Sequence, residues 1–166
     1  MINEPTAAAI YFAFQKQANA APQIYLIFDF GGGTLDISIV EISASRVLVK
    51  AFHGNSHLGG CDFDVALMDH IMTEIEQEFE DVNLRGNTDK NAKAKAKIRK
   101  EAKTAKEMLS NKNMLQTDIN IESIAAGEDY TTELTRADFE RICEPVFCQI
   151  IPLIDATLLK AGLTRD

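Results

Sequence analysis

The chain has 166 residues, of which 46% are hydrophobic and 25% charged, the composition of a soluble globular protein long enough to bury a core. No apolar run approaches the ~20 residues of a membrane-spanning helix, and the first residues lack the basic start and apolar stretch of a signal peptide. The cysteines Cys61, Cys143 and Cys148 form neither an even framework nor a Cys-x-x-Cys pair. We therefore expect a reducing, cytoplasmic compartment, with an organelle as the alternative, and no membrane partner.

The net charge of −8 is unevenly distributed along the chain. Residues 85–112 hold ten of the 17 Lys and Arg residues and only three acids, so the rest of the chain carries the negative excess. A basic segment can indicate nucleic-acid binding, but no aromatic residues that would stack on bases interleave with these lysines. We interpret the segment as a solvated helix face and predict no nucleic-acid partner.

The first elements in chain order are a helix and three strands. Residues 4–12 carry a proline in the first turn of a helix, and residues 17–23 form an alanine-rich linker. Residues 24–28 are a nearly continuous apolar run, which is typical of a strand covered on both faces. Residues 35–42 alternate between apolar and polar, and residues 46–52 form a third strand. Together they predict a meander around two tight turns.

Two helices follow a second glycine turn. Apolar residues at i+4 steps predict a helix over residues 62–80. A long basic helix is expected over residues 89–110, with an apolar seam at a 4-3-4 spacing that consists of Ile98, Ala102, Ala105 and Leu109. Residues 114–124 and 130–134 then predict a hairpin that turns at residues 126–128.

The last predicted element is a helix opened by Thr135, with Asp138 in a position close to that of a capping box. Pro145 and Pro152 lie inside it, so we expect a kink or an interruption. Gly162 is well placed as its C-cap.

The glycine turn between the first two strands carries the strongest chemical signal, and its sequence is FDFGGGTLD over residues 28–36. Three glycines let backbone N–H groups approach an anion, and Thr34 adds a hydroxyl. Asp29 and Asp36 supply carboxylates of the kind that bind magnesium beside a phosphate. The spacing is neither that of a Walker loop nor that of a dinucleotide fingerprint. On this chemistry alone, a phosphate hairpin and a plain glycine turn are equal alternatives.

A second group of polar residues lies on the basic helix. Lys103, Lys106, Glu107 and Ser110 share a face about 120° from the apolar seam. Such a group either lines a cleft or is simply solvated, and the pattern leaves both readings open.

Several segments, taken in order, resemble the heat-shock protein 70 (DnaK-like) chaperones. They are NEPTAAAI at residues 3–10, FDFGGGTLDIS at 28–38, HLGG at 57–60, DFD at 62–64, AK at 105–106, LS at 109–110 and TRADFE at 135–140. The resemblance covers essentially the whole chain. It implies a mixed α/β chain with an actin-like ATPase (ribonuclease H-like) fold, of which this chain resembles mostly the second lobe.

The resemblance also implies a domain organisation. Residues 1–58 would begin the larger subdomain of this lobe, residues 59–140 would form a smaller outer subdomain, and residues 141–166 would return to the larger one. The first lobe, the final glycine-rich adenosine loop and the peptide-binding domain of the family would lie outside this chain.

Site residues follow from the same resemblance, position by position. The phosphate hairpin would be Gly31, Gly32, Gly33 and Thr34, which hold the β- and γ-phosphates of ATP or ADP. Asp29 would lie near the cation and the attacking water, and Asp36 would be a second acid of the cation region. Glu4 would reach the metal through a bound water.

The resemblance extends to the hinge and the adenosine side. Gly59 and Gly60 match a hinge turn, and the basic helix matches the family's adenosine helix, with Lys106 and Ser110 conforming to the pattern. Lys103 stands where the family commonly has glutamate, and Glu107 where it commonly has arginine or another residue that covers adenine. The two charges are exchanged, and they are positioned to pair at i,i+4. Because glutamate does not stack on adenine as a guanidinium does, this exchange bears on adenosine affinity.

The resulting hypothesis is a part of a chaperone ATPase domain that binds ATP or ADP with Mg²⁺, or K⁺ as an additional cation. The implied partners are unfolded polypeptides, bound through a domain outside this chain, together with J-domain co-chaperones and nucleotide exchange factors. The chain alone is expected not to hydrolyse ATP and to expose apolar surface. The alternative is a non-hydrolysing, chaperone-like regulatory or interaction protein, and a sugar kinase or actin relative is a third, weaker reading.

Overall fold

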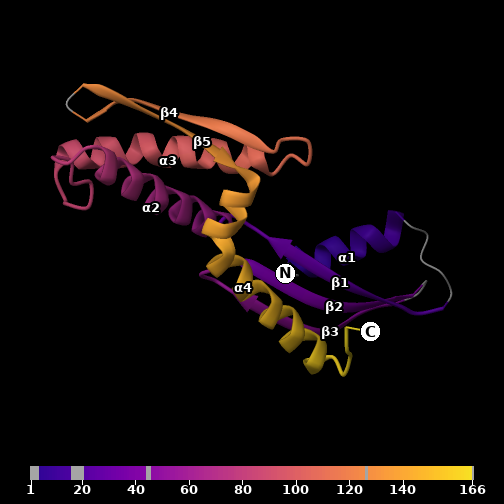
Figure 1. Ribbon diagram of the computed structural model, residues 1–166. Helices are drawn as coiled ribbons and strands as arrows, with labels where there is room; N and C mark the ends of the chain where they lie inside the picture. Colours follow the sequence, from indigo (N-terminus) through magenta and orange to yellow (C-terminus); the bar gives the residue numbers. More distant parts are fainter. Residues whose placement is uncertain (1–3, 16–20, 44–45, 126, 166) are drawn as a thin grey trace. The chain divides into compact units, whose positions relative to one another are not determined.

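The computed structural model describes residues 4–15, 21–43, 46–125 and 127–165 (Figure 1). The chain forms two compact units, which are described separately below. Unit 1 comprises residues 1–60 and 146–166, and unit 2 comprises residues 61–145. The predicted class, a mixed α/β chain, is confirmed.

Unit 1 is built on an antiparallel sheet. The helix α1 (Glu4–Gln15) precedes β1 (Gln23–Phe30), β2 (Leu35–Ser43) and β3 (Arg46–Asn55). The strands are ordered β1-β2-β3, so the predicted meander is confirmed. The predicted linker over residues 17–23 lies largely outside the described residues, and its last residue, Gln23, begins β1.

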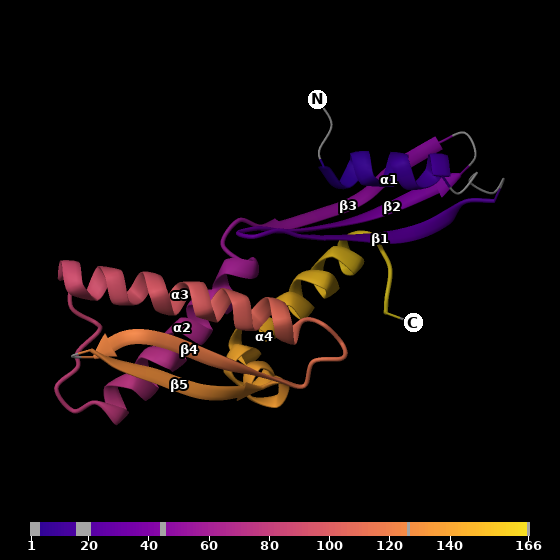
Figure 2. The same ribbon diagram turned by 90° about the horizontal axis from the view of Figure 1, so that it is seen from above.

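Helices lie on the two opposite faces of this sheet, α1 on one and the C-terminal half of α4 (Arg136–Lys160) on the other (Figures 1 and 2). On the α1 side, Ala9 packs in a buried cluster with Val40 and Ile42 of β2. On the α4 side, the Lys160 ammonium donates a hydrogen bond to the Phe52 carbonyl of β3 at 3.3 Å. The central strand, β2, is therefore covered on both faces.

The strand β1 is less covered than its apolar sequence predicted. Ile24, Leu26 and Phe28, which alternate along one face of β1, are 45%, 41% and 44% exposed. The prediction that β1 is covered on both faces is therefore wrong, because β1 is an edge strand in the described part of the chain and the helices cover mainly its neighbour. These side chains form an exposed apolar surface of the kind that was predicted.

Besides the N-terminal part of α4, unit 2 contains two helices and a hairpin. They are α2 (Gly60–Glu78), α3 (Asp89–Leu109), β4 (Gln116–Ala125) and β5 (Glu128–Thr135). The whole predicted seam of α3 is buried, which confirms it as the core face of that helix. The Tyr130 hydroxyl of β5 donates to the Glu74 carboxylate of α2 at 2.8 Å, and burial raises the pKa of this phenol above its ordinary value.

The last helix, α4, continues through Pro145 and Pro152. Of the two predicted alternatives, the interruption is therefore wrong, because each proline removes only one hydrogen bond of the helix and the others remain, whereas the kink stays a prediction. The helix ends in a Schellman motif, in which Gly162 has a φ of +72° and the Leu163 N–H bonds the Leu158 carbonyl at 3.0 Å. The predicted C-cap is thus confirmed.

By length and composition, α4 also meets the criteria for a membrane-crossing helix, with a mean hydropathy of 1.6 over its most apolar window. A single helix of this kind is weak evidence for a membrane span, because core helices of soluble proteins meet the same criteria.

Replacing Asp138 with asparagine is expected to remove a pH-dependent contribution to stability. The Thr135 hydroxyl, at the N-cap of α4, donates to the Asp138 carboxylate at 2.6 Å, and this bond, with Arg141, lowers the pKa of Asp138. A carboxyl whose pKa is lower in the folded chain stabilises it above the unfolded pKa of about 3.9, and this contribution is lost as the pH falls through the folded pKa.

Urea denaturation of the wild type and Asp138→Asn at several pH values measures the effect. The variant should be less stable at neutral pH, and the difference should close below about pH 4. Glu140→Gln, an exposed change on the same helix, is the matched control and should show no such difference. A pH-independent difference for Asp138→Asn would contradict the assignment.

Candidate phosphate hairpin and nucleotide-binding residues

The glycine turn between β1 and β2 is closed by its own backbone. The Gly31 N–H donates to the Thr34 carbonyl at 2.8 Å, while Gly32, Gly33 and Thr34 are exposed at the tip. The register of the strands continues to the last pair before the turn, Phe30 opposite Leu35. The tip therefore presents backbone and a hydroxyl on a rigid strand pair, which suits close approach of an anion.

Two carboxylates flank this turn on the same face of the sheet. Asp29 and Asp36 are directly opposite each other in the register of β1 and β2, and both are half-buried. Directly opposed like charges are unfavourable unless something offsets their repulsion. A hard cation, which prefers carboxylate oxygens, would do so, and the pair therefore fits Mg²⁺.

Sequence reasoning missed a residue that makes room for this pair. Gly54 of β3 lies opposite Asp36, and a Cβ at that position would meet the Asp36 Oδ1 at 2.5 Å. The available signal was a glycine inside a strand, which often marks a close approach. Its partner became evident only from the strand register.

The structure brings the two predicted glycine turns of unit 1 together. A Cβ on Gly59 would lie 2.5 Å from the Gly33 nitrogen and 2.6 Å from the Gly32 carbonyl carbon. The Gly60 N–H donates to the Gly31 carbonyl at 2.9 Å. The second turn therefore supports the back of the hairpin tip, in contact that only glycine permits.

The four predicted adenosine residues belong to α3 and its end, in unit 2. Lys103 and Glu107 form the expected i,i+4 ion pair at 3.8 Å, with side chains that are 61% and 62% exposed. Ser110 is the C-cap of α3, and its hydroxyl donates to the Lys106 carbonyl at 2.7 Å. The predicted set thus includes an exposed pair and a capping residue.

Lys106, the fourth member, forms a more buried contact. Its ammonium lies 2.6 Å from the Asp64 carboxylate of α2, and the two side chains are only 18% and 12% exposed. Beside them, burial raises the pKa of the Cys143 thiol to about 11, which keeps it protonated at neutral pH. Glu4 is the first residue of α1, and its side chain lies outside what the structure describes.

The comparisons with known proteins agree with these motifs. The profile of the family described as "Hsp70 protein" matches residues 1–166. The chain belongs to the Hsp70 family. Its fold is therefore that of the actin-like ATPases, as predicted, and the reading as a sugar kinase or actin is set aside.

Individual Hsp70 relatives match the whole of this chain. A "Heat shock 70 kDa protein" of Emericella nidulans is 37% identical over 166 residues, which are 24% of that relative. A ribosome-associated molecular chaperone of Saccharomyces cerevisiae is 36% identical, and the match covers 26% of it. The chain thus spans about a quarter of the length of the curated Hsp70 proteins it matches.

Proposed function

We propose that this chain is the part of an Hsp70 ATPase domain that holds the β- and γ-phosphates of ATP or ADP. The observation that carries the proposal is the hairpin tip at Gly31–Thr34. The tip is exposed to solvent, and Gly59 packs against its backbone. A turn that only needed to reverse the chain would not require a second glycine turn packed against its backbone.

Each part of the hairpin has a role in this proposal. The N–H groups of Gly32 and Gly33 and the Thr34 hydroxyl would bind phosphate oxygens, and Asp29 and Asp36 would hold Mg²⁺, with K⁺ as an additional cation. Asp29 would also orient the attacking water. Bound Mg²⁺ supplies charge neutralisation at the phosphates, so catalysis rests on positioning and electrostatics.

The remaining site residues are proposed from the family match. Glu4 would reach the cation through water, Gly60 would complete the hinge turn with Gly59, and the α3 residues Lys103, Lys106, Glu107 and Ser110 would contact adenosine. We also propose that units 1 and 2 correspond to the larger and the smaller subdomain of the second lobe.

The whole protein would couple ATP hydrolysis to the binding and release of unfolded polypeptides in the cytoplasm. J-domain co-chaperones and nucleotide exchange factors would be its partners. The names of the relatives, heat-shock and ribosome-associated chaperones, support this role.

A second candidate function is favoured by one observation. The Lys103–Glu107 pair places a carboxylate where the family commonly has a residue that covers adenine. The Lys103 and Glu107 side chains form an ion pair with each other. A non-hydrolysing regulatory relative would retain the phosphate hairpin and lose adenosine affinity. Comparison of Mg-ADP with Mg-pyrophosphate separates the two readings, because only an intact adenosine site makes Mg-ADP the tighter ligand.

Nuclear magnetic resonance titration of the ¹⁵N-labelled chain with millimolar Mg-ADP tests the phosphate hairpin. We expect shifts of the Gly32, Gly33 and Thr34 amides, and their loss when Mg²⁺ is withheld or in the variant Asp29→Asn/Asp36→Asn. The matched control Asp62→Asn/Asp81→Asn, which removes the same charge outside the hairpin, should retain the shifts. Amides that do not move, or that move equally in the Asp29→Asn/Asp36→Asn variant, would contradict the proposal.

A further inference from the structure

In the motif TRADFE, at residues 135–140, Arg136 takes part neither in the capping of α4 nor in its core. Thr135 and Asp138 form the N-cap of α4, and Phe139 is a core residue that is 8% exposed. Arg136 is the first residue of α4 and is half-buried. Its side chain reaches back to the turn between α3 and β4.

The guanidinium of Arg136 binds the backbone of residues 111–115, the turn segment. Its Nη2 donates to the carbonyl of Asn111 and, at 2.7 Å, to the carbonyl of Met114. The Arg136 backbone N–H also donates to the Leu115 carbonyl at 2.8 Å. One residue of α4 therefore holds three carbonyls of the turn segment.

Hydrogen bonds rather than packed side chains fix the turn segment. None of residues 111–115, all of which the structure describes, has a buried side chain, and Leu115 is 70% exposed. Within the segment, the Met114 N–H donates to the Asn111 carbonyl at 2.9 Å. A segment with few buried apolar contacts opens easily, so its order depends on such bonds. The Arg136 side chain supplies two that connect the segment to α4.

The orientation of the guanidinium is set by these carbonyls. The Nε of Arg136 is buried and has no hydrogen-bond partner within the described residues. An unpaired buried donor is destabilising, yet the guanidinium keeps this orientation, in which Nη2 reaches both carbonyls. A positive charge beside the carbonyl end of α3 is favourable in addition.

The turn segment begins directly after a residue of the proposed adenosine set. Ser110 is the exposed C-cap of α3, and its N–H and hydroxyl donate to the Lys106 carbonyl at 3.0 and 2.7 Å. The next N–H, that of Asn111, donates to the Met108 carbonyl at 3.1 Å. A bond that fixes Asn111 therefore also fixes the last turn of α3, which carries Glu107 and Ser110.

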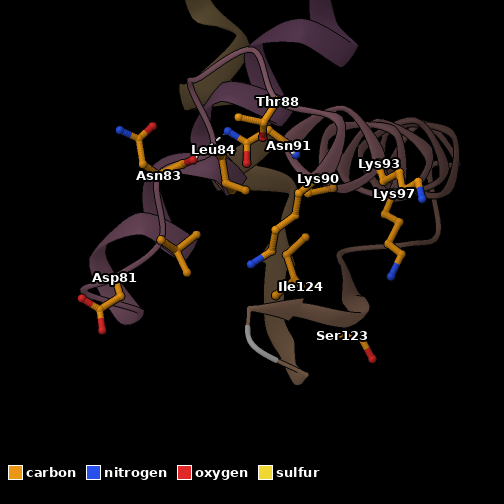
Figure 3. A pocket seen from close by; sticks show the side chains of 12 residues that line it. Asp81, Asn83, Leu84, Thr88, Lys90, Asn91, Lys93, Lys97, Ser123 and Ile124 are labelled. Carbon is orange, nitrogen blue, oxygen red and sulfur yellow. Dashed lines mark hydrogen bonds between the residues drawn. The ribbon is translucent and has the colours of Figure 1, made fainter.

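The other end of α3 is held by separate contacts. The Asn91 side-chain amide donates to the carbonyls of Asn83 and Gly86 at 2.8 and 3.1 Å, and the Asn91 N–H donates to the Thr88 hydroxyl at 3.1 Å. Asn83, Thr88 and Asn91 line an open cavity of about 440 Å³ (Figure 3). About 30 Å of helix separates these bonds from the last turn of α3, so they do not fix its position.

We propose that Arg136 is a positioning residue for the adenosine end of the nucleotide site. Through the turn segment it keeps Glu107 and Ser110 where a nucleoside would meet them, without contacting the nucleotide itself. The inference rests on the proposed function, because it takes the α3 residues as adenosine contacts. The phosphate hairpin belongs to unit 1 and Arg136 to unit 2, so loss of Arg136 should weaken the nucleoside contacts and spare the phosphate contacts.

Nuclear magnetic resonance titration of the ¹⁵N-labelled chain with Mg-ADP and with Mg-pyrophosphate tests this role. Arg136→Met keeps the apolar stem and removes the donors. It should weaken Mg-ADP binding by about fivefold or more and change the affinity for Mg-pyrophosphate by less than about twofold. Arg136→Lys should recover most of the Mg-ADP affinity, because both side-chain bonds come from one nitrogen and an ammonium can replace it.

Arg141→Met is the matched control. It removes the same charge from the same helix, where Arg141 forms an exposed ion pair with Asp138 at 3.1 Å, and should change both affinities by less than about twofold. Unchanged Mg-ADP affinity in Arg136→Met, or equal weakening in both methionine variants, would overturn this inference alone. A wild type that binds Mg-ADP no more tightly than Mg-pyrophosphate would overturn the proposed adenosine site and this inference with it. Binding of neither ligand would overturn the phosphate hairpin as well.

Hydrogen exchange of the wild type decides the matter even where Arg136→Met does not fold. Coupling is reciprocal, so a ligand that uses the adenosine end should stabilise the turn segment. Exchange of the Met114 amide, which is bonded to the Asn111 carbonyl, should slow by about threefold or more with Mg-ADP and stay unchanged with Mg-pyrophosphate. Equal exchange with the two ligands would overturn the inference.

Discussion

Replacing Gly59 with alanine is expected to displace the hairpin tip and to abolish the response of its amides to Mg-ADP. The new Cβ would lie 2.5 Å from the Gly33 nitrogen and 2.6 Å from the Gly32 carbonyl oxygen. Both are backbone atoms, which cannot rotate away as the end of a flexible side chain can. We expect a loss of about 1–3 kcal/mol in the free energy of unfolding, as for overpacked cores.

A matched glycine inside the same hairpin provides the control. A Cβ on Gly33 would meet nothing within 4 Å, and its φ is not positive. Gly33→Ala should therefore leave the free energy of unfolding unchanged or raise it by up to about 1 kcal/mol, because alanine restricts the unfolded chain. Urea denaturation measures both variants. Equal stability of Gly59→Ala and Gly33→Ala would contradict the close packing of the two turns.

The contrast between these glycines shows what the sequence could predict about the hairpin. The run of Gly31–Gly33 between two strand patterns predicted the turn, and the flanking acids predicted a cation site, because each signal is local. That Gly59 packs on the tip, and that Gly54 makes room for Asp36, depends on tertiary contact and strand register. No spacing within either motif contains that information.

The wrong prediction for β1 also arose from tertiary context, because β1 lies at the edge of the sheet. The apolar run of residues 24–28 predicted a strand, and a strand is present. Coverage of both faces depends on neighbouring strands and helices, and in the described residues the covered strand is β2, whose pattern alternated. Apolar content thus predicted the element, whereas its place in the sheet decided which side chains are buried.

On α3, helical periodicity likewise predicted the buried face but not the partners from other elements. It correctly predicted the buried seam of Ile98, Ala102, Ala105 and Leu109, and it placed Lys103 and Lys106 together on another face. Periodicity could not show that Lys106 would meet Asp64, because that partner lies on α2, in a different segment of the sequence. Lys103 and Lys106, which periodicity places on the same face, therefore differ in burial and in the carboxylate with which each forms an ion pair.

Replacing Lys106 with methionine is expected to reduce the free energy of unfolding by about 3 kcal/mol. The change keeps the apolar stem of the side chain and removes the charge that lies 2.6 Å from the largely buried Asp64 carboxylate. An unpartnered buried charge is costly, whereas removal of both charges is often close to neutral. The double variant Lys106→Met/Asp64→Asn should therefore recover much of the stability. Urea denaturation of the wild type, the two single variants and the double variant measures the coupling.

Lys103→Met is the matched control on the same helix. Its ion pair with Glu107 spans 3.8 Å between side chains that are mostly exposed, so its removal should cost less than about 0.5 kcal/mol. A similar loss from both lysine variants, or no recovery in the double variant, would contradict a stabilising role for the Lys106–Asp64 pair. Because Lys106 is also proposed to contact adenosine, Mg-ADP affinity must be compared in the recovered double variant, where a remaining loss reports binding rather than unfolding.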